Sequence, residues 1–285
     1  MDAATGRFTA MASPCEVLVD GADAAELRRV TRVVETEVRR IEQLWSRYRE
    51  GNVVHRINTA GGRAITVDDE TAQFLDYAAH LHAWSDGLFD VTSGVLRRAW
   101  KFDGSDRVPA QSQVDALLPL VGWDKVSWQS PVLQMPMGME IDFGGIGKEY
   151  AVDRACALAR YATSLPVLVN CGGDLACTGP RANGEPWQVG IDTGVPGAAT
   201  PLVKLSQGGV ATSGDANRFL LKDGVRYPHV LDPRSGWPVT GGPRAITVAA
   251  QTCTEAGVLS TVALLHGAGA EEFLNDNDAD SSLTW

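Results

Sequence analysis

Apolar residues recur at steps of three and four positions in several segments, and this spacing predicts helices that cover a core. Helices are predicted over 24–48, 69–85, 107–118, 146–161 and 253–266, and an acidic surface helix is predicted from Glu271. Asp23 with Glu26 suits a cap for the first helix, and Thr252 with Glu255 forms a capping box for the last long one. The polar, glycine-bearing segment 49–63 is expected to be a loop.

Alternating apolar and polar residues between these helices predict short strands. Strands are predicted over 8–20 with a break at Ser13-Pro14, over 122–128, 140–143, 165–170, 187–191, 201–205 and 245–250, before a turn in 227–238, and at the C-terminus. Strands and helices in this order predict an α+β protein. The sequence has no internal repeat and no low-complexity linker, so we expect a single domain over residues 1–285.

The stretch 138–153 carries the strongest sign of a ligand site. Ile141 and Phe143 alternate with polar residues, Gly144 and Gly145 permit a sharp turn, and helical spacing starts at once. Free amides at a helix start, with glycines that let a ligand come close, bind anions, and Lys148 adds positive charge. The ordinary alternative, a strand-to-helix connection without a ligand, stays open on this stretch alone.

Two further glycine turns are predicted, centred on Gly172 and Gly214, and the second carries two hydroxyls and a carboxylate. The segment 88–94 and Trp100 offer the flat apolar wall and hydrogen bonds that a flavin needs, although the same aromatic residues suit a core plug. His229 stands before a Pro-Arg-Ser-Gly turn, where a single histidine is more often structural than catalytic.

Composition narrows the possible functions. The 285 residues carry a net charge of −10, which argues against a nucleic-acid surface, so an anionic ligand would need local amides, a few basic residues or a metal. The five cysteines match no zinc spacing and are expected to be free thiols. Neither a Rossmann fingerprint nor a Walker A motif occurs. No signal peptide, lipid-anchor cysteine or membrane-spanning run is visible, so a cytoplasmic protein that is not integral to a membrane is expected.

Several segments, taken in order, resemble the ApbE-type FAD:protein FMN transferases. They are FTAMASPCEV, SRY and the later RIN, DGLFDVTSGVLRRAWKF, LVGWDKV, EIDFGGIGKEYAVDRA, LVNCGGDLACTG, GVATSGD, YPHVLDPRSGWPV and the final STV helix. The resemblance implies a mixed-sheet core with flanking helices, related to the T-fold. It also implies that FAD is the substrate, that a Ser or Thr hydroxyl of an acceptor flavoprotein receives FMN, and that AMP leaves with assistance from Mg²⁺.

The resemblance also implies roles for individual residues. The residues that would border FAD are Met11, Tyr48, Leu88, Phe89, Asp90, Gly144, Lys148, Tyr150, Thr212, Ser213, Asp215 and Val230. His229 would handle the proton, and the Gly147 carbonyl and Thr261 hydroxyl would be metal ligands. The family has a ligand Asp four residues before this threonine, where this chain has Gly257. Glu255 would compensate only if the helix start shifted, and Gly257→Asp is expected to raise Mg²⁺ affinity.

Other departures keep three functions open. The chain has Asn52-Val53 where the family commonly has Ser-Glu, and Ala12-Ser13 where it commonly has Gly-Thr. An active flavinyltransferase is the first hypothesis. A flavin-binding protein without transfer activity is the second, motivated by Gly257. An FAD pyrophosphatase that passes FMN to water is the third, motivated by the altered loop after Tyr48.

Overall fold

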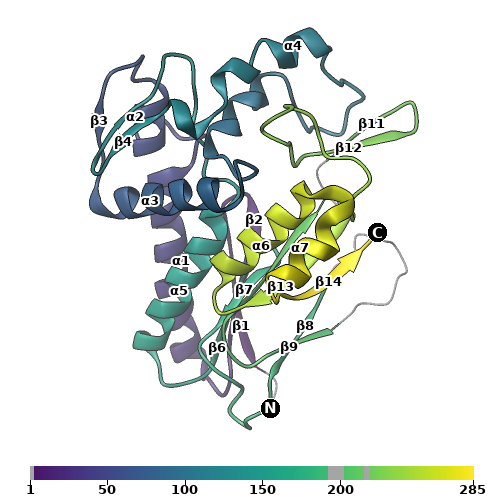
Figure 1. Cartoon of the computed structure of the whole chain (residues 1–285). Coiled ribbons are helices and arrows are strands. Elements are labelled where there is room, and N and C mark those ends of the chain that lie inside the picture. Colours follow the sequence, from purple (N-terminus) through teal and green to yellow (C-terminus); the bar gives the residue numbers. More distant parts are fainter. Residues whose placement is uncertain (1–2, 192–201, 215–218) are drawn as a thin grey trace.

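A computed structural model of the chain describes residues 3–191, 202–214 and 219–285 (Figure 1). Within these residues, seven strands form the main sheet. In spatial order they are β1 (Ala4–Ala10), β2 (Ser13–Val19), β6 (Val167–Cys171), β7 (Asp174–Cys177), β10 (Gly209–Gly214), β13 (Ala245–Ala250) and β14 (Asp280–Thr284). Each neighbouring pair is antiparallel, so the α+β class is confirmed but this sheet is antiparallel where a mixed one was expected.

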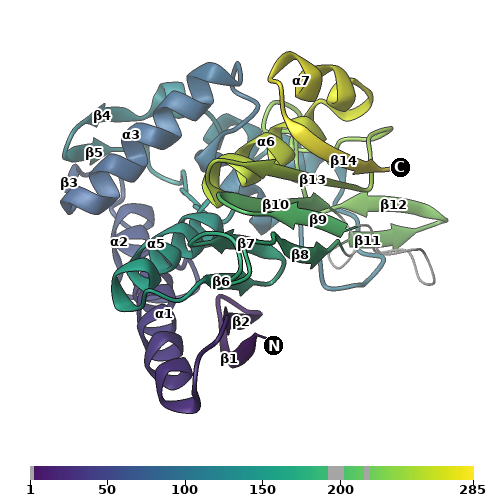
Figure 2. The same cartoon turned by 90° about the horizontal axis from the view of Figure 1, so that it is seen from below.

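Helices cover one face of this sheet (Figures 1 and 2). They are α1 (Ala24–Trp45), α5 (Gly147–Ala162), α6 (Cys253–Leu265) and α7 (Ala270–Asp276). Side chains of one strand alternate between the two faces, so Val169 faces the helices while Leu168 faces the other side. That other side is covered by the ribbon of β8 (Trp187–Gly190) and β9 (Leu202–Leu205).

Two smaller layers surround the upper ends of α1 and α5 in Figure 1. The first contains α2 (Val53–Asn58), α3 (Asp69–Trp84) and a three-stranded sheet of β3 (Ile65–Thr66), β5 (Val132–Gln134) and β4 (Ser127–Gln129). The second contains α4 (Gln111–Asp115), β11 (Phe219–Lys222) and β12 (Val225–Pro228). Short 3₁₀ segments complete the fold at Val91–Arg98, Leu118–Leu120, Trp123–Lys125 and Gly267–Gly269.

The long amphipathic helices are predicted well. The structure confirms α1, α3, α5 and α6 within a few residues, and Asp23 and Thr252 cap α1 and α6 as expected. The strands β13, β8 and β9 are also confirmed, and β8 pairs with β9. The two-residue turn between β6 and β7 contains two glycines with positive φ angles, as a tight hairpin requires.

Several shorter predictions are wrong. The segment 49–63 contains the helix α2, because Asn52 caps it and three apolar residues in 53–57 are buried against the core. The predicted helix over 107–118 shortens to α4, and 122–128 begins as a 3₁₀ turn. The first hairpin turns at Met11-Ala12, two residues before the expected break. Residues 139–143 are extended but join no sheet, and Gly209–Gly214 is a central strand rather than a turn.

Within residues 3–191, 202–214 and 219–285, no helix combines the length and the apolar character that crossing a bilayer requires.

Candidate functional site

The segment before α5 is held in place by side chains instead of strand partners. The Asn58 amide donates to the Ile141 carbonyl over 3.0 Å and accepts from the Ile141 amide over 2.8 Å, so it imitates a neighbouring strand. The Asp142 amide donates to the Val91 carbonyl over 2.8 Å. The extended segment therefore delivers the glycine turn to the start of α5 in one defined position.

The start of α5 keeps the features of an anion site. Ile146 occupies the cap position without a capping side chain, and the amides of Ile146 and Gly147 both donate to the Phe143 carbonyl, over 3.1 and 2.7 Å. Gly145 packs so closely under Phe89 that a Cβ atom on it would lie 3.3 Å from the ring. Backbone amides at a helix start attract negative charge, and Gly145 provides the space that the Phe89 ring occupies beside them.

Lys148 provides the positive charge beside this turn. Its Nζ lies 2.6 Å from Oδ2 of Asp174, which is buried at the β6–β7 turn. Burial acts to lower the pKa of Lys148, but the carboxyls of Asp174 and Glu149 outweigh it and the pKa is raised. The amine also lies 3.6 Å from the position that a Cβ on Gly172 would take, so the first two predicted glycine turns meet at this lysine.

An arginine links the exposed Tyr48 to the same turn. One guanidinium nitrogen of Arg47 lies 2.5 Å from Oδ2 of Asp142, and another donates to the Tyr48 hydroxyl over 2.8 Å. Asp142 also accepts from the Gly144 amide over 3.0 Å. Tyr48 is 77% exposed and the Arg47 guanidinium lies 4.9 Å from the centre of its ring, so the ring is held at the rim of the turn, where a flat ligand could stack on it.

Leu88, Phe89 and Asp90 lie on the other side of the turn and are all buried. The Asp90 carboxylate accepts from the Thr92 amide over 2.7 Å and from the Trp123 amide over 2.9 Å. These bonds occupy both of its oxygens, so Asp90 organises the loop from within. Of these three residues, Phe89 is the one seen to contact the glycine turn directly.

Helices α5 and α6 are locked in register by Asp153. Its carboxylate accepts from the amides of Cys253 and Thr254, both over 2.8 Å, and from the Thr254 hydroxyl over 2.6 Å. Asp153 therefore caps the start of α6 from the side of α5. One turn earlier on α5 and one turn later on α6, the same register brings Glu149 against Gly257.

Glu149 fills the space that a side chain at position 257 would enter. A Cβ atom built on Gly257 would lie 2.6 Å from Cγ of Glu149, 3.1 Å from Cδ and 3.3 Å from Oε1. Glu149 is 8% exposed, and its Oε2 is buried without a hydrogen-bond partner among the described residues. Burial, followed by the nearby Asp174 carboxyl, raises the pKa of Glu149 to about 8. This carboxyl group was not among the predicted site residues.

Hydroxyl groups of β10 and α6 meet on the helix side of the sheet. The Ser213 hydroxyl lies 2.9 Å from Oγ1 of Thr261 and 2.8 Å from Oγ of Ser260. Thr212 points to the opposite face, where its hydroxyl lies 2.8 Å from that of Thr247. Asp215 lies outside the described residues. The structure thus brings Ser213 to the metal-ligand candidate Thr261 and sends Thr212 elsewhere.

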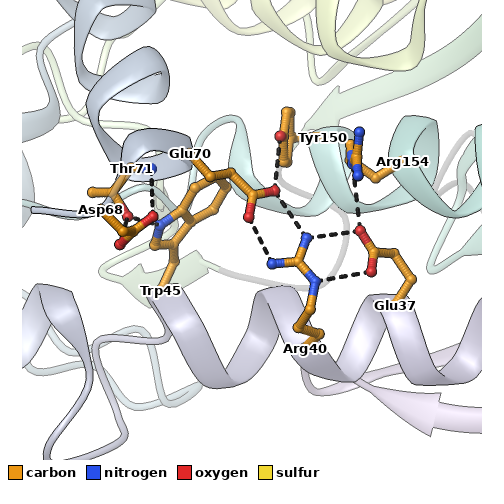
Figure 3. A network of polar contacts seen from close by, with 8 residues as sticks. All are labelled: Glu37, Arg40, Trp45, Asp68, Glu70, Thr71, Tyr150 and Arg154. Carbon is orange, nitrogen blue, oxygen red and sulfur yellow. Dashed lines mark hydrogen bonds and ion pairs between the residues drawn. The ribbon is translucent and has the colours of Figure 1, made fainter.

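Tyr150 belongs to a polar network on the far side of α5 (Figure 3). Its hydroxyl donates to Oε1 of Glu70 over 3.0 Å, and Arg40 bridges Glu70 to Glu37 with contacts of 2.6 to 2.9 Å. The Tyr150 ring packs among the rings of Trp45 and Phe74. This network ties α1, α3 and α5 together, and it engages the tyrosine hydroxyl in a bond to Glu70.

His229 and Val230 directly follow β12, which belongs to the second of the two smaller layers. The imidazole of His229 lies 6.3 Å, ring centre to ring centre, from Phe102, and Val230 packs against the main core. Trp100 is 2% exposed and donates to the Gly236 carbonyl over 2.8 Å, so it serves as a core plug. Met11, in the left-handed turn between β1 and β2, packs at the junction of the two largest cores.

The cluster that the structure assembles is therefore smaller than the predicted site. It contains the glycine turn, Lys148, Phe89, and Gly147 at the first position of α5. Thr261 lies on α6 one turn after Gly257, and its hydroxyl contacts that of Ser213. Sequence reasoning missed Asn58, Arg47 and Glu149. A hollow of about 140 Å³ is lined by Asn58, Met137 and Gly138 among others, and none of its lining residues belongs to this cluster. Within the described parts of the chain, no three His, Cys, Asp or Glu side chains gather as a metal-binding group.

Comparison with known proteins places these features in context. A family model described as "ApbE family" matches residues 11–283. A protein of Salmonella typhimurium named FAD:protein FMN transferase is 30% identical over 253 residues, covering 84% of this chain and 72% of that protein. The crystal structure of the ApbE protein from Thermotoga maritima matches with a TM-score of 0.90 and 29% identity, covering 99% of this chain and 94% of that one. The apo flavinyl transferase ApbE from Pseudomonas stutzeri matches with a TM-score of 0.85 and 28% identity, covering 99% and 92%.

Proposed function

This chain belongs to the ApbE family, and on that premise we propose that it transfers the FMN part of FAD to a Ser or Thr hydroxyl of an acceptor flavoprotein. The observation that carries the proposal is the uncapped start of α5, with the glycine turn before it and Lys148 at its second residue. Relatives named FAD:protein FMN transferase support the choice of substrate. We also propose that residues 1–285 act as a single domain.

Different residues of the cluster would bind different parts of FAD. The amides of the first turn of α5 and the Lys148 amine would hold the pyrophosphate, because both present positive charge to it. Phe89, Leu88 and Met11 would border the apolar part of the ligand, and Tyr48 would cover a ring at the rim. The remaining residues proposed as a border of the FAD site are Asp90, Gly144, Tyr150, Thr212, Ser213, Asp215 and Val230.

The transfer itself exchanges one phosphorus–oxygen bond for another. The acceptor hydroxyl oxygen bonds to the FMN-side phosphorus, the bond to the bridging oxygen breaks, and AMP leaves with that electron pair. We assign His229 to take the hydroxyl proton. Positioning and charge neutralisation supply most of the catalysis in such a step, so the fixed turn held by Asn58 has a direct function.

The residues present fit a divalent cation. The Glu149 side chain lies beside Gly257, and its Oε2 is buried without a hydrogen-bond partner among the described residues. Along the chain, Glu149 stands two residues after Gly147, and Thr261 follows Gly257 by one turn of α6. Oxygen ligands of this kind suit Mg²⁺. When bound, Mg²⁺ would neutralise charge on the phosphate oxygens.

The sequence departures that favoured other functions have local structural explanations. Asn52 caps α2 by accepting from the His55 amide over 2.8 Å, and it donates to the Ser46 carbonyl over 2.6 Å. Gly257 is the residue that makes room for Glu149. Neither departure by itself supports a pyrophosphatase or a flavin-binding protein without activity, so both become outcomes of the test.

One assay separates the three functions. The full chain is incubated with FAD, Mg²⁺ and a candidate acceptor domain, and AMP release is followed together with flavin fluorescence of the acceptor on a denaturing gel. AMP with a fluorescent acceptor supports the transferase. AMP and free FMN without labelling indicate a pyrophosphatase, and bound FAD without either product indicates a binding protein. Lys148→Met is expected to abolish labelling, while Lys222→Met, at an exposed lysine of β11, serves as the control.

A further inference from the structure

Position 257 cannot carry a side chain while Glu149 keeps its present conformation. The nearest contact of a built Cβ, 2.6 Å to Cγ of Glu149, is far shorter than carbon atoms tolerate. The carboxylate carbon lies 3.1 Å from the same point. The Glu149 carboxylate thus occupies the volume into which a short acidic side chain on residue 257 would project.

Glu149 also has an oxygen that no protein group uses. Its Oε2 is buried and unpaired among the described residues, and leaving such an atom unpaired costs free energy unless a water or an ion completes it. The charged groups that act on it are the carboxyls of Asp174 and Asp153 and one cation, Lys148. One amine therefore lies among three carboxyl groups, an arrangement of oxygen atoms that suits a bound cation better than a further anion.

The neighbouring carboxyls are already committed. Both oxygens of Asp153 accept hydrogen bonds from amides at the start of α6. Oδ2 of Asp174 lies 2.6 Å from Nζ of Lys148. Glu255, the residue closest to Gly257 along α6 that could have compensated, accepts from the Gln251 amide over 3.1 Å at the helix surface. Oδ2 of Asp174 also lacks a hydrogen bond, but it faces the Lys148 amine. Of these carboxyl groups in the described residues, Glu149 is therefore the one whose buried oxygen, Oε2, has neither a hydrogen bond nor an ion pair, and its side chain meets Gly257.

We propose that Glu149 is the carboxylate ligand of the divalent cation, so that α5 supplies the acidic ligand that the family's pattern takes from position 257 of α6. This inference rests on the proposed transferase function for the identity of the cation. The Gly147 carbonyl and the Thr261 hydroxyl complete an all-oxygen donor set, which selects Mg²⁺ or Mn²⁺ over softer metals. Gly257 is then required as the space for the relocated ligand.

The test is Mn²⁺ binding to the full chain, measured by electron paramagnetic resonance with and without FAD. Glu149→Gln keeps the size of the side chain, and it is expected to weaken Mn²⁺ binding by about tenfold or more. Glu255→Gln, the matched control, is expected to bind as the wild type does. Gly257→Asp alone is expected to weaken binding because the new side chain collides with Glu149, which reverses the expectation drawn from the sequence.

A reciprocal exchange sharpens the test. The double variant Glu149→Gly with Gly257→Asp moves the carboxylate from α5 to α6, and its Mn²⁺ affinity is expected to return to within about threefold of the wild type. Wild-type affinity in Glu149→Gln, or no Mn²⁺ binding by the wild type with or without FAD, would overturn the inference. Should a variant not fold, Mn²⁺ soaked into wild-type crystals decides by anomalous scattering, with a peak expected about 2.0–2.4 Å from a Glu149 oxygen and a peak elsewhere contradicting the inference.

These outcomes separate this inference from the proposed function. If the wild type labels an acceptor while Glu149→Gln keeps the wild-type Mn²⁺ affinity, Glu149 is not the metal ligand and the proposed transferase function still stands. Mn²⁺ bound at Glu149 without labelling of any acceptor supports the ligand assignment and counts against the transferase.

Discussion

Replacing Gly257 by alanine tests the contact on which the α5–α6 arrangement depends. The added methyl group would lie 2.6 Å from Cγ of Glu149. Glu149 is 8% exposed, so its side chain cannot simply swing into solvent. The substitution therefore forces either the carboxylate or one of the helices to move.

Two opposing effects set the size of the change. Overpacking of this kind costs about 1–3 kcal/mol of unfolding free energy, whereas exchanging a glycine for alanine inside a helix stabilises by about 1 kcal/mol. In the wild type the collision outweighs the propensity gain, and Gly257→Ala should destabilise by up to about 2 kcal/mol. In a Glu149→Ala background the collision is absent, so the same substitution should stabilise by about 1 kcal/mol.

The assay is urea unfolding of the wild type, both single variants and the double variant at neutral pH. The sign reversal of the Gly257→Ala effect between the two backgrounds corresponds to a coupling energy of about 1–3 kcal/mol. An equal effect in both backgrounds, or stabilisation by Gly257→Ala in the wild type, would refute the claim that Glu149 occupies the space above position 257.

Three further outcomes follow from the ion pairs and caps. Lys148→Met leaves the buried Asp174 without its cation, so urea unfolding should show a loss of about 3 kcal/mol, and unchanged stability would contradict the pair. Asp153→Ala removes the carboxylate that accepts from the Cys253 and Thr254 amides while leaving the Thr252 cap of α6 in place, and it should cost about 1–2 kcal/mol in the same assay; unchanged stability would contradict this role. Hydrogen bonds from Arg40 lower the pKa of Glu37 in the folded state, so its stabilisation is present above the unfolded pKa and lost as pH falls through the folded one. Glu37→Gln should therefore destabilise by about 1–2 kcal/mol at pH 7, and the difference from the wild type should shrink as the pH falls through the lowered pKa of Glu37; a constant difference would refute the assignment.

The parts of the fold that could be predicted from sequence are those in which a long periodic pattern coincides with a cap. Helix α1 repeats its apolar face over six turns after Asp23, and α6 begins at a capping box. Helix α2 is too short for its period to stand out, although Asn52 before two valines was a readable start signal. The α5 start was also predictable, because the change of period after two glycines marks it.

The wrong predictions have a common physical origin in tertiary partners. Ile141 and Phe143 alternate like a strand, but the partner of Ile141 is the amide of Asn58, which no pattern along the chain reveals. The glycines at 208–214 indicated a turn, yet they allow close packing: a Cβ on Gly209 would lie 2.4 Å from the Cys253 amide nitrogen. A glycine within a strand can therefore mark a place where another backbone packs closely, and not only a bend.

The candidate site was also predictable only where local sequence marks it, and not where tertiary contacts decide the role of a residue. Lys148 and the glycine turn were found from local sequence, while Asp90 and Tyr150 turned out to hold structural hydrogen bonds. Glu149 was not predicted, because the family's pattern places the acidic ligand at position 257. Its own signal was available: it stands at the spacing of the buried Val152 and Cys156 on α5, and an acidic residue on an apolar stripe points to a partner.

A crystal structure of the full chain with FAD tests the central claim most directly. We expect the pyrophosphate at the start of α5, within hydrogen-bond distance of the first-turn amides and near Lys148, with the flavin beside Phe89. Dinucleotide density in another place, such as the hollow lined by Asn58 and Met137, with the α5 turn closed by the protein's own side chains, would contradict it.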